Sequence, residues 1–338
     1  MLVPAAADAA GSLGSAHLWL VSIAVLVALL IADFAITHRP HEVSAREAVG
    51  WSVFYLALPV VFAIWLWSAF GSGPAVEFMT GFVVEKSLSV DNLFVFMLLL
   101  GAFSVPTEVR QRVLLYGIVG ALVLRGVFIA VGAAMLAAGT WAFLVFGLVL
   151  FVSAVKLLRD AFTGGEVERD VSRMRSVRLL RKLMPVTGDY RGARLTVRER
   201  GHRALTPLAV VVVAVFATDV VFAIDSVPAV YGITDDPYLV FATNAFALLG
   251  LRALYFVLHS ALAKLVHLNH GLAVILAFIG AKLALHWAHG IWPGVPEIPT
   301  PVSLAVIIGT LAVVTATSLR SRRRSGTSAA RKTTAPQD

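Results

Sequence analysis

The feature that most constrains this chain is a series of apolar runs, each long enough to cross a lipid bilayer as a helix. Nine such runs lie near residues 17–37, 49–70, 75–103, 112–137, 140–160, 206–232, 238–262, 270–289 and 302–319. Hydrophobic residues make up 59% of the chain and charged residues only 14%, a balance that excludes an ordinary soluble domain. The sequence therefore predicts an all-α polytopic membrane protein with about nine transmembrane helices.

Arginine and lysine are distributed unevenly over the connections between these runs, and this distribution predicts the orientation of the chain. They are concentrated in the hydrophilic segment 161–205 and in the tail, whereas the segments 1–16 and 71–74 contain none. We therefore expect the N-terminus outside the cell and the C-terminus inside it. The basic segment 161–205 is expected to be a cytoplasmic loop. Its stretch 168–184 is either an interfacial helix on anionic lipids or a solvated linker.

Two of the apolar runs contain paired carboxylates. Glu85 and Asp91 lie in the third run, Asp219 and Asp225 lie in the sixth, and one offset of 134 residues superimposes the two pairs. A charge in the bilayer core costs several kcal/mol unless it is paired, hydrated or coordinated. The two pairs therefore indicate the two halves of one intramembrane cation site.

Further matches between the two regions indicate an internal repeat. Leu124-Arg125 corresponds to Leu251-Arg252, and Ala154-Val155-Lys156 corresponds to Gly280-Ala281-Lys282. Because the charge distribution orients the third and sixth runs oppositely, the two three-helix repeats are inverted, as in many secondary transporters. The expected organisation is two N-terminal helices (1–73), a first three-helix repeat (74–160), the basic loop (161–205), a second three-helix repeat (206–290), a C-terminal helix (291–320) and a disordered basic tail (321–338).

The expected site offers oxygen ligands, because the chain contains no cysteine. Carboxylate, amide and hydroxyl oxygens suit magnesium, calcium or manganese, and they suit copper or zinc poorly. The predicted metal-binding residues are Glu85, Asp91, Asn92, Asp219, Asp225, Ser226 and Asn244.

Helix geometry leaves two arrangements open for each carboxylate pair. Six residues turn an ideal helix by about 600°, so Glu85 and Asp91 would point about 120° apart. In the first arrangement the helices are interrupted, and Pro228 offers a cause because it leaves the carbonyl of Ile224, beside Asp225, without its donor. In the second arrangement only one carboxylate of each pair binds the ion directly.

Four basic side chains within the runs are predicted to pair with these acids: Lys86, Arg125, Arg252 and Lys282. Arg125 and Arg252 lie too deep to reach the interface, so each is expected to have a carboxylate partner. Lys156 lies near enough to the cytoplasmic end of its run to reach the interface instead. The alternative to a cation site is that the acids only pair with these bases and hold the bundle together.

The chain resembles the TerC/Alx family of integral membrane proteins in four stretches: EKSLSVDNLFVF, GIVGALVLRGVFI, ATDVVFAIDSVPAV and FALLGLRALYF. They cover the third to eighth runs. The family is named for tellurium resistance and linked to manganese export, so the resemblance implies a divalent-cation exporter. In the family pattern many members carry a glutamate three residues before the first aspartate of the second motif. Here that position is Phe216, which removes one carboxylate from the ligand set.

Together with the resemblance, the sequence thus predicts an exporter of divalent cations in the bacterial inner membrane, with manganese as the leading candidate, that works by alternating access. A divalent ion would add two positive charges to a nearly neutral cluster. Proton release from the carboxylates would offset them, as would movement of Arg125 or Arg252 away from the site.

Two other classes of protein are alternatives to a transporter. One is a non-transporting membrane scaffold or metallation partner in tellurium or metal stress resistance. The other is an intramembrane protease, but no GxGD-type run accompanies the aspartates, so an enzyme is not expected. The net charge of +8 lies mostly in loops assigned to the cytoplasm and in the tail, so nucleic acid is not an expected partner.

Overall fold

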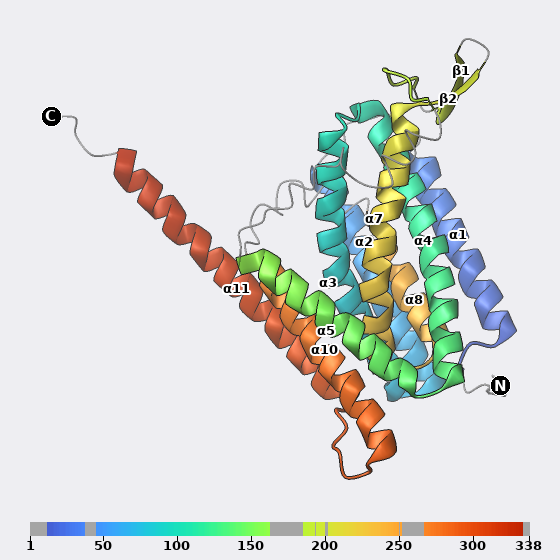
Figure 1. Cartoon of the computed structure of the whole chain (residues 1–338), viewed down its shortest axis with the longest axis vertical. Coiled ribbons are helices and arrows are strands. Elements are labelled where there is room, and N and C mark those ends of the chain that lie inside the picture. The colour runs from blue at the N-terminus through green and yellow to red at the C-terminus, as the bar shows by residue number, and fades with distance from the viewer. Residues whose placement is uncertain are drawn as a thin grey trace.

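The computed structural model describes residues 12–37, 45–162, 185–192, 194–199, 202–249, 251 and 267–333. This part of the chain is mostly helical, as Figure 1 shows. The helices are α1 (Ala16–Thr37), α2 (Ala45–Phe70), α3 (Ser72–Ala102), α4 (Thr107–Ala138), α5 (Trp141–Phe162), α7 (Pro207–Tyr231), α8 (Pro237–Leu248), α10 (Leu268–Ile291) and α11 (Thr300–Thr333).

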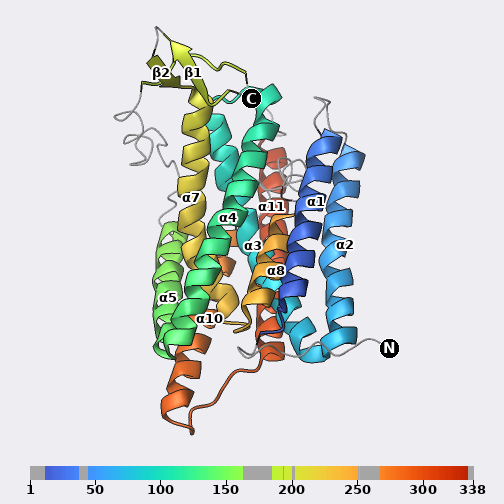
Figure 2. The same ribbon diagram turned by 90° about the vertical axis from the view of Figure 1, so that its right-hand side faces the viewer.

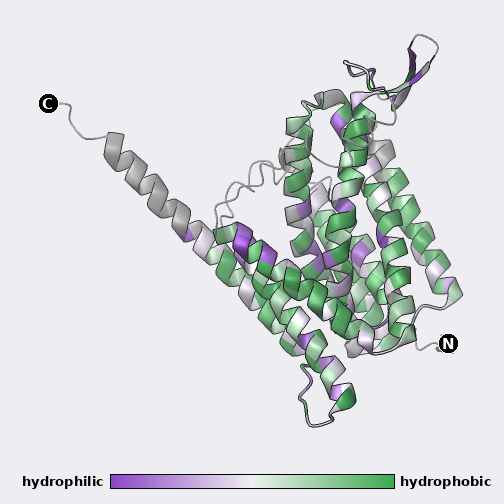
Figure 3. Ribbon diagram, viewed as in Figure 1, coloured by the Kyte–Doolittle hydropathy of each residue, from purple (hydrophilic) through white to green (hydrophobic). Residues whose placement is uncertain are grey.

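Six of the described helices are long and apolar enough to cross a membrane, namely α2, α4, α5, α7, α10 and the first part of α11. Figure 3 shows that hydrophobic residues cover most of these helices. Many of their large apolar side chains face outward, as in Trp67, Val123 and Leu148, which suits contact with lipid. The structure therefore agrees with a helical membrane protein, while the total of nine spans stays a prediction.

Three local expectations differ from the structure. The segment 161–205 contains an antiparallel hairpin, in which β1 (Thr196–Glu199) pairs with β2 (His202–Leu205). The tail was expected to be disordered from residue 321, but the backbone of α11 is helical to Thr333, in keeping with the helix propensity of its alanines and arginines. Helix α8 ends at Leu248, well before the expected end of that run. The stretches 168–184 and 252–266 lie outside the described residues.

The connections between helices lie alternately at two ends of the molecule (Figures 1 and 2). The α2–α3, α4–α5, α7–α8 and α10–α11 connections lie at one end, and the α3–α4 connection and the β1–β2 hairpin lie at the other. Helix α5 runs antiparallel to α10, because Phe143 contacts His286 whereas Phe162 contacts His270. The third helices of the two expected repeats thus run in opposite directions.

Helices α5 and α10 cross at two glycines that face each other. A Cβ placed on Gly147 would lie 2.9 Å from the carbonyl oxygen of Gly280, and a Cβ on Gly280 would lie 2.9 Å from that of Gly147. The next contacts are reciprocal as well, since Gly147 meets Leu283 and Gly280 meets Leu150. The crossing is therefore locally two-fold symmetric, and the absence of side chains lets the two backbones approach closely.

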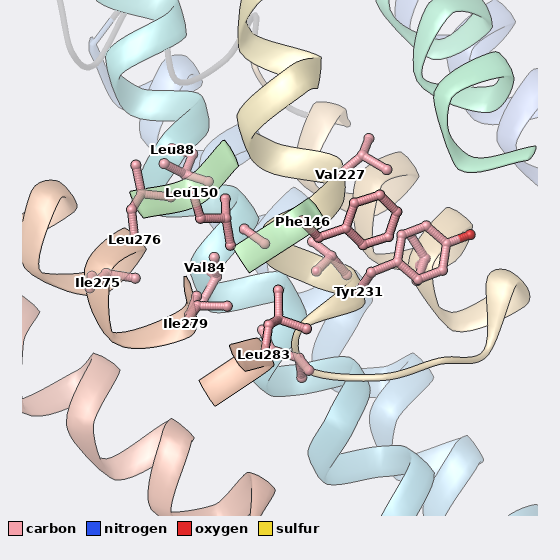
Figure 4. Packing of buried hydrophobic residues seen from close by; sticks show 14 of the residues in the cluster. Val84, Leu88, Phe146, Leu150, Val227, Tyr231, Ile275, Leu276, Ile279 and Leu283 are labelled. Atoms are coloured by element: carbon pink, nitrogen blue, oxygen red, sulfur yellow. The ribbon is translucent and has the colours of Figure 1, made fainter. Parts of the chain in front are cut away.

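A large apolar cluster joins this crossing to the rest of the bundle (Figure 4). It combines Phe146 and Leu150 of α5 with Ile279 and Leu283 of α10 and with side chains from α3 and α7 such as Val84. The cluster contains buried side chains from both expected repeats, so the two repeats share one hydrophobic core.

Candidate functional site

A buried arginine organises the polar side chains inside the bundle. Arg125 lies in the middle of α4, and its side chain is only 1% exposed. Its Nη1 forms an ion pair with Glu85 of α3 and donates a 2.7 Å hydrogen bond to Asn244 Oδ1 of α8. Its Nη2 lies 4.0 Å from Asp219 Oδ1 of α7. In the structure, Arg125 therefore has carboxylate neighbours on two other helices.

Helix α3 presents three polar residues on one face toward this arginine. Glu85, Ser89 and Asn92 are spaced by four and three residues, which places them on the same side of a helix. All three are buried. With the Asn92 amide oriented to satisfy both of its ends, Oδ1 accepts from Arg125 Nη2 at 3.2 Å and Nδ2 donates to the carbonyl of Leu88.

Helices α7 and α8 supply the opposite side. Asp219 and Ser226 of α7 and Asn244 of α8 are each about 1% exposed. The Asn244 amide is held in place, because Nδ2 donates to the carbonyl of Val240 one turn earlier. Asp219 Oδ2 and Ser226 Oγ have no hydrogen-bond partner within the described part of the chain. We call Arg125, Glu85, Asn92, Asp219 and Asn244 the Arg125 cluster.

The Arg125 cluster holds two carboxylates and one guanidinium, which leaves it one negative charge if all three groups are ionised. Taking such charges out of water costs several kcal/mol per ion, and only close pairing and hydrogen bonds offset that cost. Arginine suits this place because its planar group carries five N–H donors, enough to reach three helices at once. Pairing and hydrogen bonds therefore hold the cluster together, and with all three groups ionised its excess negative charge would be stabilised by a cation.

Asp225 lies outside this cluster. It is half-buried on α7, and its Oδ1 accepts a 2.5 Å hydrogen bond from Ser153 of α5. Lys156 of α5, assigned to the interface on sequence, interacts electrostatically with the same carboxylate. Ser153 was not predicted as a site residue. The available signal was its polar side chain within an apolar run, since such side chains often contact another helix.

The two arrangements left open by helix geometry can now be compared. Helix α7 continues through Pro228 to Tyr231, and α3 is continuous from Ser72 to Ala102, so neither helix is interrupted at its carboxylates. In the second pair Asp219 belongs to the Arg125 cluster and Asp225 does not, while direct binding of an ion by one carboxylate of each pair stays a prediction. The side chain of Asp91 and the whole of Arg252 lie outside the described residues.

The two lysines predicted to pair with acids lie in other surroundings. Lys86 donates to the carbonyl oxygens of Ala247 and Leu249 at 3.1 Å and 3.5 Å. Lys282 interacts electrostatically with three acids: Glu77, Asp235 and Glu297. These acids lie near the end of the molecule that holds the α7–α8 connection, and Glu77 belongs to the first part of α3. Lys282 thus has acidic partners, but they are not the acids of the two motifs.

Phe216 occupies the position where the family pattern has a glutamate. A Cβ on Gly120 of α4 would overlap the Phe216 ring, so the two residues pack directly at the contact between α4 and α7. Within the described residues, no three histidine, aspartate or glutamate side chains converge as a metal-binding group. The complete ligand set therefore stays a prediction.

The fold and the Arg125 cluster define a class of protein: a helical integral membrane protein with a charged cluster buried between its helices. The chain belongs to the TerC family, because the model of the Integral membrane protein TerC family matches residues 70–326. The expected family is thereby confirmed.

Related proteins match over nearly the whole chain. Uncharacterized membrane protein STKORF319 of Myxococcus xanthus is 39% identical, covering 94% of this chain and 96% of its own. The putative membrane-bound redox modulator Alx of Photorhabdus laumondii is 38% identical, covering 89% and 94%. Tellurium resistance protein TerC of Serratia marcescens is 36% identical, covering 87% and 91%. No solved structure shows significant similarity to the chain.

Proposed function

We propose that this chain exports a divalent metal cation, with manganese as the first candidate, across the bacterial inner membrane. The observation that carries the proposal is the complete burial of Glu85 and Asp219 among four helices around Arg125. Acids at such depth are costly and usually mark an ion pathway. The oxygens of Asn92, Asn244 and Ser226 add neutral ligands of the kind that manganese, magnesium or calcium accepts.

The guanidinium of Arg125 occupies the place that a bound metal ion would need. Transport therefore requires the ion to displace Arg125 from Glu85 and Asp219, or to bind where further carboxylates contribute. Asp225 is a candidate second position, since it is half-buried and hydrogen-bonded only to Ser153 within the described residues. Under this proposal Asp225 and the Arg125 cluster are two positions along the path of the ion, which moves from one to the other.

An inverted repeat with nine spans, N-terminus outside and C-terminus inside, forms part of the proposal. The antiparallel run of α5 and α10 and their reciprocal contacts at Gly147 and Gly280 support it. In this crossing Gly147 corresponds to Gly280, an offset of 133 residues. The sequence match instead paired Gly280 with Ala154, which lies about two turns further along α5. In inverted-repeat transporters the substrate binds near the midplane, where the repeats meet.

A second candidate function is a non-transporting scaffold or metallation partner in tellurium or metal stress resistance. One relative is named a putative redox modulator and another a tellurium resistance protein. The total lack of cysteine argues against thiol redox chemistry carried by this chain itself. The buried acids favour transport over a scaffold, because a docking role would need only surface groups.

Metal transport is expected to stop when either motif loses an acid. In inside-out vesicles that hold the wild-type chain, radioactive manganese should accumulate. Asp91→Asn and Asp225→Asn change charge with little change of volume, so each should reduce uptake to the level of empty vesicles. Glu199→Gln in the exposed β1 strand is the matched control and should transport normally. Full uptake by both well-expressed aspartate variants would place the site elsewhere.

Manganese binding should also release protons. Closely spaced carboxylates share protons when no ion is bound, and a divalent cation favours their ionised forms. Adding manganese to the purified protein in weakly buffered detergent should therefore acidify the solution between pH 6 and 8. Binding without proton release would instead indicate that movement of an arginine balances the charge.

A further inference from the structure

Helix α8 ends inside the helical bundle, where it packs against α3 and α4. It spans 12 residues, or about 18 Å, which is short of the roughly 30 Å hydrocarbon core. The backbone leaves the helix at Leu249, with φ −59° and ψ 135°, although the sequence remains apolar beyond it. Leu248 and Leu249 are both buried among apolar side chains.

The end of a helix leaves its last carbonyl oxygens without backbone donors. In water such oxygens are hydrated, but in a membrane each unpaired one costs several kcal/mol. The same end carries the partial negative charge of the helix dipole. The end of α8 is therefore a place where a cation with hydrogen-bond donors would be stabilised.

Lys86 supplies that cation. Its Nζ lies 3.1 Å from the Ala247 oxygen and 3.5 Å from the Leu249 oxygen, one on each side of the helix end. Within the described part of the chain, Lys86 forms no ion pair with a carboxylate. Its ammonium is thus bound by neutral carbonyl oxygens, as alkali ions are at broken transporter helices.

We propose that the broken end of α8 is a carbonyl-type binding site for a monovalent cation, and that Lys86 is its covalently tethered occupant. The site lies beside the Arg125 cluster, because Glu85 precedes Lys86 on α3 and Asn244 lies one turn before the end of α8. Lys86 thereby holds the helix end that positions Asn244 toward Arg125. The inference does not depend on metal transport.

Chemical rescue tests the proposal on the purified, metal-free protein. Lys86→Ala should lower the midpoint of thermal unfolding by several degrees, and millimolar methylammonium should restore much of the loss. Tetramethylammonium, which has no N–H donor, should not. The wild-type chain should respond to neither ion, because its site is filled. An unchanged midpoint in Lys86→Ala, or equal effects of methylammonium on both proteins, would overturn the assignment.

A second variant separates charge from hydrogen bonding and covers the case in which Lys86→Ala does not fold. Lys86→Gln keeps an N–H donor of similar reach but carries no charge. Its midpoint should lie clearly below that of the wild-type chain. A midpoint equal to wild type would show that no cation is needed at the end of α8. Ser87→Ala, which loses only a bond to Val83 on its own helix, is the matched control and should show a small change.

Discussion

Replacing Arg125 by methionine should lower the free energy of unfolding by about 3–5 kcal/mol, the usual cost of removing one partner from a buried ion pair. The loss arises because Glu85 and Asp219 remain buried without the guanidinium that neutralises them. Asn244 also loses its 2.7 Å hydrogen bond. Denaturant unfolding of the purified protein in detergent, followed by tryptophan fluorescence, measures the change.

A double variant shows whether the loss comes from the unpaired acid. Arg125→Met combined with Glu85→Gln removes both charges of the ion pair, so it should be more stable than Arg125→Met alone. The coupling energy of the cycle isolates the contribution of the pair. A double variant whose loss equals the sum of the two single losses would mean that Arg125 and Glu85 do not interact.

The single variant Arg125→Met also tests the proposal that a divalent cation binds at the Arg125 cluster. If a divalent cation takes the place of the guanidinium, manganese should stabilise Arg125→Met more than it stabilises the wild-type chain, because ligand binding to the folded state raises stability. Equal stabilisation of both proteins would indicate that the ion binds away from Arg125.

Alanine at either glycine of the α5–α10 crossing should destabilise the protein by about 1–3 kcal/mol, the usual range for overpacking. At Gly147 and at Gly280 the new Cβ would lie 2.9 Å from a backbone oxygen of the other helix, so the helices must separate. Because both substitutions strain one contact, their effects should not add in the double variant.

A third glycine provides the control for this experiment. Gly309 in α11 has open space around the position of a Cβ, so Gly309→Ala should be neutral or gain up to about 1 kcal/mol from helix propensity. The midpoints of thermal unfolding of the three alanine variants make the comparison. If Gly147→Ala were as stable as Gly309→Ala, the close approach of α5 and α10 would be disproved.

The sequence by itself determined the membrane class, the family and the residues around which the site is built. Apolar runs of bilayer length have one favourable environment, so composition and run length predict the helices directly. A deep arginine such as Arg125 has few ways to avoid the cost of its charge, so its pairing with a carboxylate was predictable before any partner was known.

Only the tertiary structure decided which helices meet and what each polar group contacts. Periodicity gives the face of a residue on its own helix, but contacts such as Ser153 with Asp225 depend on how α5 packs against α7. The end of α8 could not be predicted from the sequence, because the chain stays apolar beyond Leu248. Lys86 was therefore predicted to pair with an acid. In the structure it donates instead to carbonyl oxygens at the end of α8, which the sequence pattern does not reveal.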